Sequence, residues 1–161
     1  MRVNQAGEIG AVRIYQGQLA VLRNAKSAKQ IRHMAQQERH HVETFDRLIA
    51  ENNTRPTILS PLWHMAGFAL GAATALMGER AAMACTVAVE EVIDGHYAKQ
   101  VEQLGEDQAE LKGTIKTFQA EEVEHRDIGL ANGAEQALGY PLLSAAIKAG
   151  CKAAIWLAER F

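Results

Sequence analysis

The sequence has few cysteines and few prolines. The two cysteines, Cys85 and Cys151, are spaced neither as a disulfide framework nor as a cysteine metal site. We therefore expect both to be small buried residues in a reducing compartment. Three prolines in 161 residues, with little β-branched alternation, argue against a strand-rich fold and favour helices.

An excess of charge is also lacking. The formal net charge is −2 and the basic residues are scattered, which argues against a nucleic-acid partner. No cleavable signal precedes the first expected helix, because the chain passes from Met1 to Glu8 without an apolar run, although a segment upstream of Met1 is left open. The length is sufficient for one domain, residues 1–161, with a full hydrophobic core.

Breaks rich in asparagine, glycine and proline divide the sequence into six expected helices. The first of them is predicted to have Asn4 as its N-cap. The expected ranges are 4–23, 27–52, 61–77, 79–104, 108–130 and 140–160.

Four of these helices carry a glutamate in the middle of an apolar stripe, and two of the four carry a histidine three positions later. Residues three apart lie on one face of a helix, so the members of each Glu-x-x-His pair can bind the same metal centre. Buried carboxylates are costly unless they are paired or bound to metal. The six side chains are Glu8, Glu38, His41, Glu90, Glu122 and His125.

The spacing of these residues repeats along the chain. Glu90 follows Glu8 by 82 positions, and Glu122 follows Glu38 by 84. This repeat indicates two helical hairpins packed about a pseudo-twofold axis. Four carboxylates and two imidazoles match the charge and ligand number of a carboxylate-bridged dimetal site in a four-helix bundle. A single such glutamate is ordinarily a solvated boundary residue, and a single such histidine a hydrogen-bonded core residue; the repeated placement favours the metal site.

Two residues adjacent to the ligand candidates are not predicted to be ligands. His40 and Glu121 point to other faces of their helices and are expected to be surface residues.

The segment 58–78 carries no formal charge. If the second and third bundle helices run parallel, this segment would serve as the crossover that travels the length of the bundle between them. A crossover that is apolar on all sides would lie in a membrane interface, in an oligomer contact or across a bilayer. Pro61 and three glycines shorten the useful helix, which argues against a span across the bilayer. Of the three alternatives, we favour the membrane interface. Residues 140–160 form a second amphipathic candidate, whose Lys148, Lys152 and Arg160 would meet anionic headgroups unless the segment packs on the bundle.

Seven stretches of the sequence are similar to the demethoxyubiquinone hydroxylase family of ubiquinone biosynthesis, among the ferritin-like diiron carboxylate proteins. Gln5 departs from the histidine more usual at its position in that family. The stretches are 4–8 with 13–15, 55–57, 61–63, 67–72, 82–91 and 121–130.

The resemblance implies an all-α, ferritin-like four-helix bundle with a long apolar crossover helix and an additional C-terminal helix. It also implies an O₂-dependent monooxygenase with two iron ions per chain, held by the six side chains above, that hydroxylates a polyprenylated demethoxyubiquinol. Electrons would come from NADH, although the sequence has no Gly-x-Gly-x-x-Gly motif for a Rossmann site. His96 and Tyr97 are candidates for supporting the ligands or relaying electrons. The protein would be peripheral, on the cytoplasmic face of a bacterial inner membrane or the matrix face of a mitochondrial one, with a homo-oligomer or another biosynthetic protein as partner.

Two other classes remain open at this point. A ferritin-type iron store would have a more polar exterior than the segment 58–78 offers. A membrane-associated metal or redox sensor would bind iron without consuming O₂.

Overall fold

The computed structural model describes residues 1–161 and contains six α-helices, two short 3₁₀ helices and no strand. The helices are α1 (Arg2–Leu22), α2 (Ala28–Glu51), α3 (Ser60–Leu76), α4 (Glu79–Gln103), η1 (Glu106–Gln108), α5 (Ala109–Ala131), η2 (Ala134–Gln136) and α6 (Tyr140–Ala158). All six expected α-helices are confirmed, with ends displaced by at most two residues.

The starts of the helices have identifiable causes. Pro61 and Pro141 lie in the first turns of α3 and α6, where a missing backbone N–H breaks no hydrogen bond within the helix. The prediction of Asn4 as an N-cap is wrong. The helix α1 begins at Arg2, and the buried Asn4 side chain donates instead to Gln100 Oε1 at 2.8 Å.

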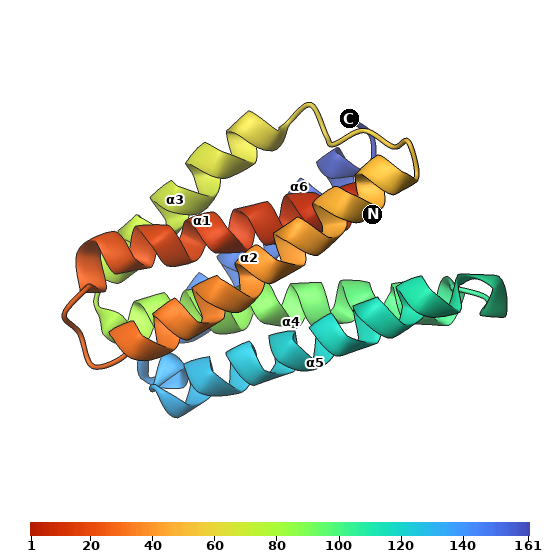
Figure 1. Ribbon diagram of the computed structural model, residues 1–161. Helices are drawn as coiled ribbons and strands as arrows, with labels where there is room; N and C mark the ends of the chain where they lie inside the picture. Colours follow the sequence, from red (N-terminus) through yellow and green to blue (C-terminus); the bar gives the residue numbers. More distant parts are fainter.

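The bundle consists of two hairpins, α1–α2 and α4–α5, and each has an additional helix packed on its first member (Figure 1). The helices α2 and α4 run in the same direction, so the chain must travel back along the bundle between them, and α3 does so while lying on α1. The helix α6 takes the corresponding place on α4. The predicted ferritin-like four-helix bundle, with its crossover helix and its C-terminal helix, is confirmed.

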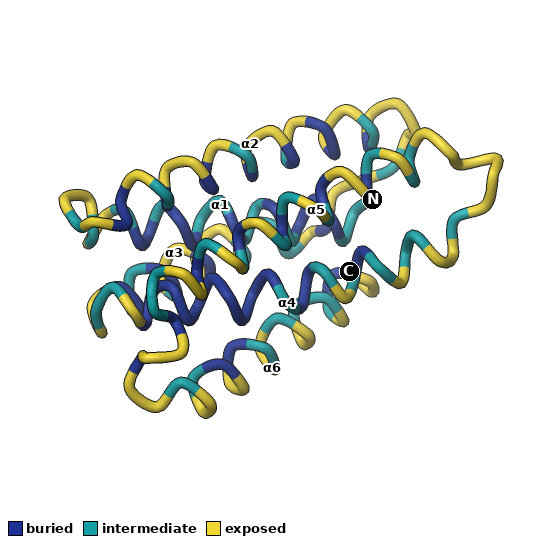
Figure 2. The backbone as a smooth tube through the Cα atoms, turned by 90° about the horizontal axis from the view of Figure 1, so that it is seen from below, coloured by how far each residue is buried: buried dark blue, intermediate teal, exposed yellow.

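The helix α4 is the most deeply placed element (Figure 2). Every residue from 81 to 90 is buried. Two apolar clusters surround the bundle axis, one that includes Met34 and Val87 and another that includes Phe45 and Phe118. On α2, Glu38 and His41 fall between Met34 and Phe45, so the polar residues are enclosed by apolar packing on both sides.

The contact between α1 and α3 depends on glycine. A Cβ at Gly71 would overlap the Ile14 carbonyl, and one at Gly17 would overlap the Phe68 carbonyl. The two backbones therefore approach more closely than any larger residue allows. This contact fixes the inner face of α3.

The outer faces of α3 and α6 remain apolar and exposed (Figure 2). Met65 is 73% exposed and Leu76 is 76% exposed on α3. On α6, Leu142 and Trp156 are exposed as well. By length and composition, only α6 qualifies as a helix that could cross a membrane.

Candidate metal centre

The six predicted side chains meet in the middle of the bundle, and each is at most 1% exposed. They come from four helices: α1 and α4 supply one glutamate each, and α2 and α5 supply one Glu-x-x-His pair each. Their ligand atoms form two overlapping groups of four that share Glu38 and Glu122. The first group adds Glu8 and His41, and the second adds Glu90 and His125.

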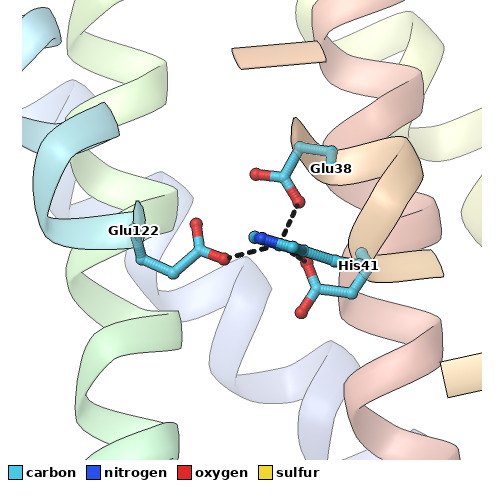
Figure 3. Close-up of side chains that lie close together, drawn as sticks. Glu38, His41 and Glu122 are labelled. Atoms are coloured by element: carbon cyan, nitrogen blue, oxygen red, sulfur yellow. Dashed lines mark ion pairs between the residues drawn. The ribbon is translucent and has the colours of Figure 1, made fainter. Parts of the chain in front are cut away.

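The histidines lie between carboxylates of both hairpins. The Nδ1 atom of His41 is 3.2 Å from Glu122 Oε1 and 3.4 Å from Glu38 Oε2 (Figure 3). The Nδ1 atom of His125 is 3.1 Å from Glu38 Oε1 and 3.3 Å from Glu122 Oε2. Glu38 and Glu122 therefore face both imidazoles, as shared ligands of two ions would.

The donor atoms of this cluster fit a pair of divalent metal ions. Carboxylate oxygens together with imidazole nitrogens suit iron and similar first-row ions. Buried polar atoms normally have hydrogen-bond partners, yet in this cluster all six residues have at least one inward atom without one. The unpartnered atoms are Glu8 Oε2, both carboxylate oxygens of Glu38, His41 Nδ1, Glu90 Oε2, both carboxylate oxygens of Glu122, and His125 Nδ1.

Without a metal, protons have to balance the charge of the cluster. Burial and the neighbouring carboxylates of Glu38 and Glu122 raise the pKa values of Glu8 and Glu90 well above the ordinary range. Burial also acts to raise the pKa of Glu38, but the adjacent imidazoles of His125 and His41 outweigh it and the pKa is lowered. Burial opposes protonation of His125, whereas its contacts with Glu122 and Glu38 raise its pKa to about 11. Strongly shifted groups gathered in one place are typical of functional sites.

Two tyrosines hold the single glutamates from the opposite hairpin. Tyr15 of α1 donates its hydroxyl to Glu90 Oε1 at 2.5 Å, and Tyr97 of α4 donates to Glu8 Oε1. Each tyrosine stands seven positions after the glutamate of its own helix. The tyrosines thus extend the pseudo-twofold pattern beyond the six clustered side chains, and each leaves one carboxylate oxygen free to face the centre.

The far nitrogen of each histidine has its own partner. His41 Nε2 lies 2.5 Å from Glu121 Oε2, and His125 Nε2 lies 2.9 Å from Gln37 Oε1. The interpretation of Glu121 as a surface residue is wrong, because its side chain is only 30% exposed and contacts a buried imidazole. His40 is exposed, as predicted. Gln37 and Glu121 each precede a shared glutamate by one position, and this was the signal in the sequence that could have identified them.

The candidates His96 and Tyr97 have different surroundings. Tyr97 contacts a glutamate of the cluster, as described above. The His96 ring lies 3.1 Å from Asn4 Oδ1 and 3.0 Å from the Gln100 amide, and it contacts none of the six clustered side chains. His96 therefore belongs to a separate polar group.

A largely apolar cavity of about 540 Å³ lies beside the cluster. Residues of α1, α3, α4 and α6 line it, and 18 of the 25 lining residues are hydrophobic. Glu8 and Tyr97 belong to its wall, with Asn4 and His96 nearby. Because Glu8 also belongs to the cluster, a molecule in the cavity would lie against one residue of the cluster.

Comparison with known proteins identifies the family. The family described as "Ubiquinone biosynthesis protein COQ7" matches residues 1–158. The 3-demethoxyubiquinol 3-hydroxylase of Rhodospirillum rubrum is 64% identical over 161 residues, which cover 99% of this chain and 76% of that protein.

Eukaryotic proteins also match nearly the whole chain, but at lower identity. The human protein named NADPH-dependent 3-demethoxyubiquinone 3-hydroxylase, mitochondrial, is 50% identical over 164 residues, covering 99% of this chain and 76% of its own length. The 5-demethoxyubiquinone hydroxylase, mitochondrial, of Saccharomyces cerevisiae is 41% identical over 177 residues, with the same coverage. The family match and these identities, taken with the clustered glutamates and histidines, lead to one conclusion: the chain belongs to the COQ7 family of ubiquinone biosynthesis proteins.

Proposed function

We propose that this protein is a dinuclear iron monooxygenase that hydroxylates the ring of a polyprenylated demethoxyubiquinol. The family and the hydroxylase names of the relatives support an enzyme of ubiquinone biosynthesis, and this chain is a hydroxylase of that pathway. The observation that carries the proposal is the position of Glu8, which belongs both to the carboxylate cluster and to the wall of the apolar cavity.

The six clustered side chains are the proposed ligands of two iron ions. When bound, such a pair of ions supplies the activation of O₂, of which one oxygen atom enters the substrate ring and the other leaves as water. Glu38 and Glu122 would be shared between the ions, because each faces both imidazoles. The tyrosine hydroxyls hold Glu8 and Glu90 in place while leaving one oxygen of each directed inward.

The cavity provides the binding site for the substrate in this proposal. Its hydrophobic lining excludes water and favours a quinol ring with the first part of an apolar tail. The polar side chains in its wall, Asn4 and His96, contact each other and would have to exchange that contact to orient ring oxygens. The ring would then lie against Glu8, on the side of the cluster that opens into the cavity.

The release of water requires two electrons from outside the substrate. We propose a reduced nicotinamide nucleotide as their source, with NADH as the donor expected from the resemblance. The names of several relatives, including the human protein, contain NADPH. Single-turnover reduction with each nucleotide in turn would identify the donor for this chain.

The exposed apolar side chains of α3 support docking to a membrane interface through residues 58–78. A substrate with a polyprenyl tail resides in the bilayer, and α3 lines the cavity that would receive it. The helix α6 also lines the cavity and exposes Leu142 and Trp156. Of the basic side chains expected to meet headgroups, Lys148 pairs with Glu91, and the Arg160 guanidinium lies 3.9 Å from the centre of the Trp156 ring. Burial of apolar surface, and not these charges, would therefore dominate binding.

The corresponding location is peripheral, on the cytoplasmic face of a bacterial inner membrane or the matrix face of a mitochondrial one.

The proposed reaction is tested by loading the purified protein with ferrous iron under anaerobic conditions and adding a demethoxyubiquinol and ¹⁸O₂. Mass spectrometry should find one ¹⁸O atom in the ring of the product. Iron uptake and O₂ consumption without a hydroxylated product would instead favour the alternative, a ferritin-like iron-binding or redox-sensing bundle.

Membrane docking is tested by flotation with liposomes of a neutral phospholipid. Wild-type protein should float, and the Met65→Glu/Leu76→Glu variant should remain at the bottom, because both side chains are exposed and leave the bundle core unchanged. Val21→Glu/Leu130→Glu is a matched control that adds the same charge at exposed positions on α1 and α5. Flotation of both variants would contradict docking through α3. Loss of a wild-type dimer in the first variant would assign the α3 face to a homo-oligomer instead.

A further inference from the structure

The partners of the two histidines break the pseudo-twofold symmetry of the metal centre. Gln37 and Glu121 occupy equivalent positions, each one residue before a shared glutamate and each in contact with the histidine of the opposite hairpin. Their side chains have nearly the same shape, but the Gln37 amide is neutral and the Glu121 carboxylate is an anion. The ligand pattern is otherwise the same in both halves.

The orientation of the rings makes this difference chemically relevant. Both Nδ1 atoms face the carboxylates at 3.1 to 3.5 Å, so Nδ1 is the nitrogen available to a metal. A histidine that binds metal through Nδ1 carries its proton on Nε2. That proton is donated to Glu121 from His41 and to Gln37 from His125.

Hydrogen bonds to a charged acceptor are roughly twice as strong as those between neutral groups. A carboxylate that accepts the distal N–H of a ligating histidine also makes the imidazole a better electron donor to its metal. The His41 ring therefore gains basicity that the His125 ring lacks. The extra negative charge of Glu121 also lies on the His41 side of the cluster, where it favours a cation.

We infer that Glu121 and Gln37 are positioning residues that make the two metal positions unequal: the position at His41 binds a divalent ion more tightly than the position at His125. This inference rests on the proposed function, because it requires that the cluster binds two ions. A consequence is that a chain supplied with one equivalent of metal fills the His41 position first. The higher oxidation state is favoured at the same position.

Cobalt(II) titration of metal-free protein tests the inference without reference to activity, using calorimetry for the affinities and visible absorption for the ligand environment. Wild-type protein should take up two ions, the first more tightly. Glu121→Gln should weaken the tighter binding about 10- to 100-fold, which is the range typical of partners of metal-binding histidines. Gln37→Glu should change affinity in the opposite direction, by strengthening the weaker position.

The double variant Gln37→Glu/Glu121→Gln is the sharpest comparison, because it has the composition and charge of the wild type. It should retain two ordered steps, but its spectrum at one equivalent of cobalt should differ from that of the wild type, since the His125 position now fills first. Glu124→Gln removes one charge from the same helix, at an exposed residue 3.4 Å from His33, and should leave both steps unchanged.

The outcomes separate the inference from the function it rests on. If wild-type protein binds no cobalt, the dimetal site itself is wrong. If it binds two ions but Glu121→Gln leaves both dissociation constants within twofold of wild type, or if both single variants weaken binding equally, the inequality of the positions is wrong. Unchanged circular dichroism spectra of the variants would confirm that the fold is retained in each case.

Discussion

The first half of the chain, α1 to α3, and the second half, α4 to α6, have the same order of helices but pack their outer helices differently. The helix α3 lies directly on α1 through glycine contacts at Gly17 and Gly71. The helix α6 packs on α4 with larger side chains such as Ile147, and the cavity lies where these two helices face α1 and α3. The cluster of glutamates and histidines is thus nearly symmetric, whereas the surrounding layer is tight between α1 and α3 and leaves a cavity beside α4 and α6.

The largest expected effects come from the parts that the halves share. Glu38→Ala and Glu122→Ala each remove a carboxylate that faces both histidines, so either change should reduce metal content and lower turnover by more than about 100-fold. Metal analysis and product formation are the measurements. His40→Ala, at an exposed neighbouring position, should have no such effect. A Glu38→Ala/Glu122→Ala variant with two irons and full activity would show that the ligand assignment is wrong.

The outer helices should respond in opposite directions to the same substitution. Gly71→Ala places a methyl group against the Ile14 carbonyl, and overpacking of this kind costs about 1–3 kcal/mol of unfolding free energy. Gly150→Ala in α6 meets no atom within 4 Å and should stabilise the helix by roughly 0.5–1 kcal/mol. Chemical denaturation of the metal-free proteins measures both. Equal effects of the two changes would remove the contrast between α3 and α6.

The stability of the metal-free protein should fall as the pH rises above neutrality. The raised pKa values of Glu8 and Glu90 give a stabilisation that is complete below the ordinary carboxyl range and is lost as the pH rises through the raised values. The pKa of His125, raised to about 11, acts in the same direction above about 6.5. The lowered pKa of Glu38 opposes this trend only in acid, since its contribution is complete above its ordinary value.

Thermal melts between pH 7 and 9.5 measure this dependence. Glu8→Gln and Glu90→Gln should each reduce the slope of midpoint against pH, by similar amounts, because the two glutamates occupy equivalent places in the halves. Metal-loaded protein should show a smaller slope, since the ions replace the protons. A midpoint of the metal-free protein that is constant or rises with pH would contradict the buried, proton-balanced cluster.

The smallest effects are expected at the tyrosines. Tyr15→Phe and Tyr97→Phe each remove one hydrogen bond to a glutamate, and each should cost about 0.5–1.5 kcal/mol of unfolding free energy. Denaturation of the two variants compares the halves with almost no change in volume. If the two variants lost clearly different amounts of unfolding free energy, the pseudo-twofold symmetry would not extend from the proposed metal ligands to the tyrosines.

Much of this arrangement could be predicted from the sequence because it depends on local periodicity. The six helices follow from their breaks at glycine, proline and asparagine, and the six clustered side chains from glutamates placed within apolar stripes. Glu121 was misassigned for a physical reason. Helical periodicity places it one residue, or about 100°, away from the buried face, and only the rotation of α5 against α2 brings it to His41. Tyr15 lies on the buried face of α1, but its hydrogen bond to Glu90 of α4 depends on how these two helices pack.

The Asn4 prediction shows a related limit. Asparagine near the start of a helix ordinarily indicates a cap. In this chain it lies within the first turns of α1 and contacts Gln100 of α4, 96 positions away. A contact between residues so far apart in the sequence cannot be predicted from the local composition around either residue. The cavity was likewise not predictable, because it depends on how closely α3 and α6 approach the bundle.

The composition of the two ligand groups has a consequence for the order of events during synthesis. Each group takes three ligands from one half of the chain and one from the other: Glu122 completes the first group, and Glu38 completes the second. The α1–α2 hairpin emerges from the ribosome first and cannot offer a complete set of ligands. In the proposed dinuclear site, a metal ion would therefore gain its full set of four ligands only after the second hairpin has docked on the first, so that complete metal binding would follow the assembly of both halves.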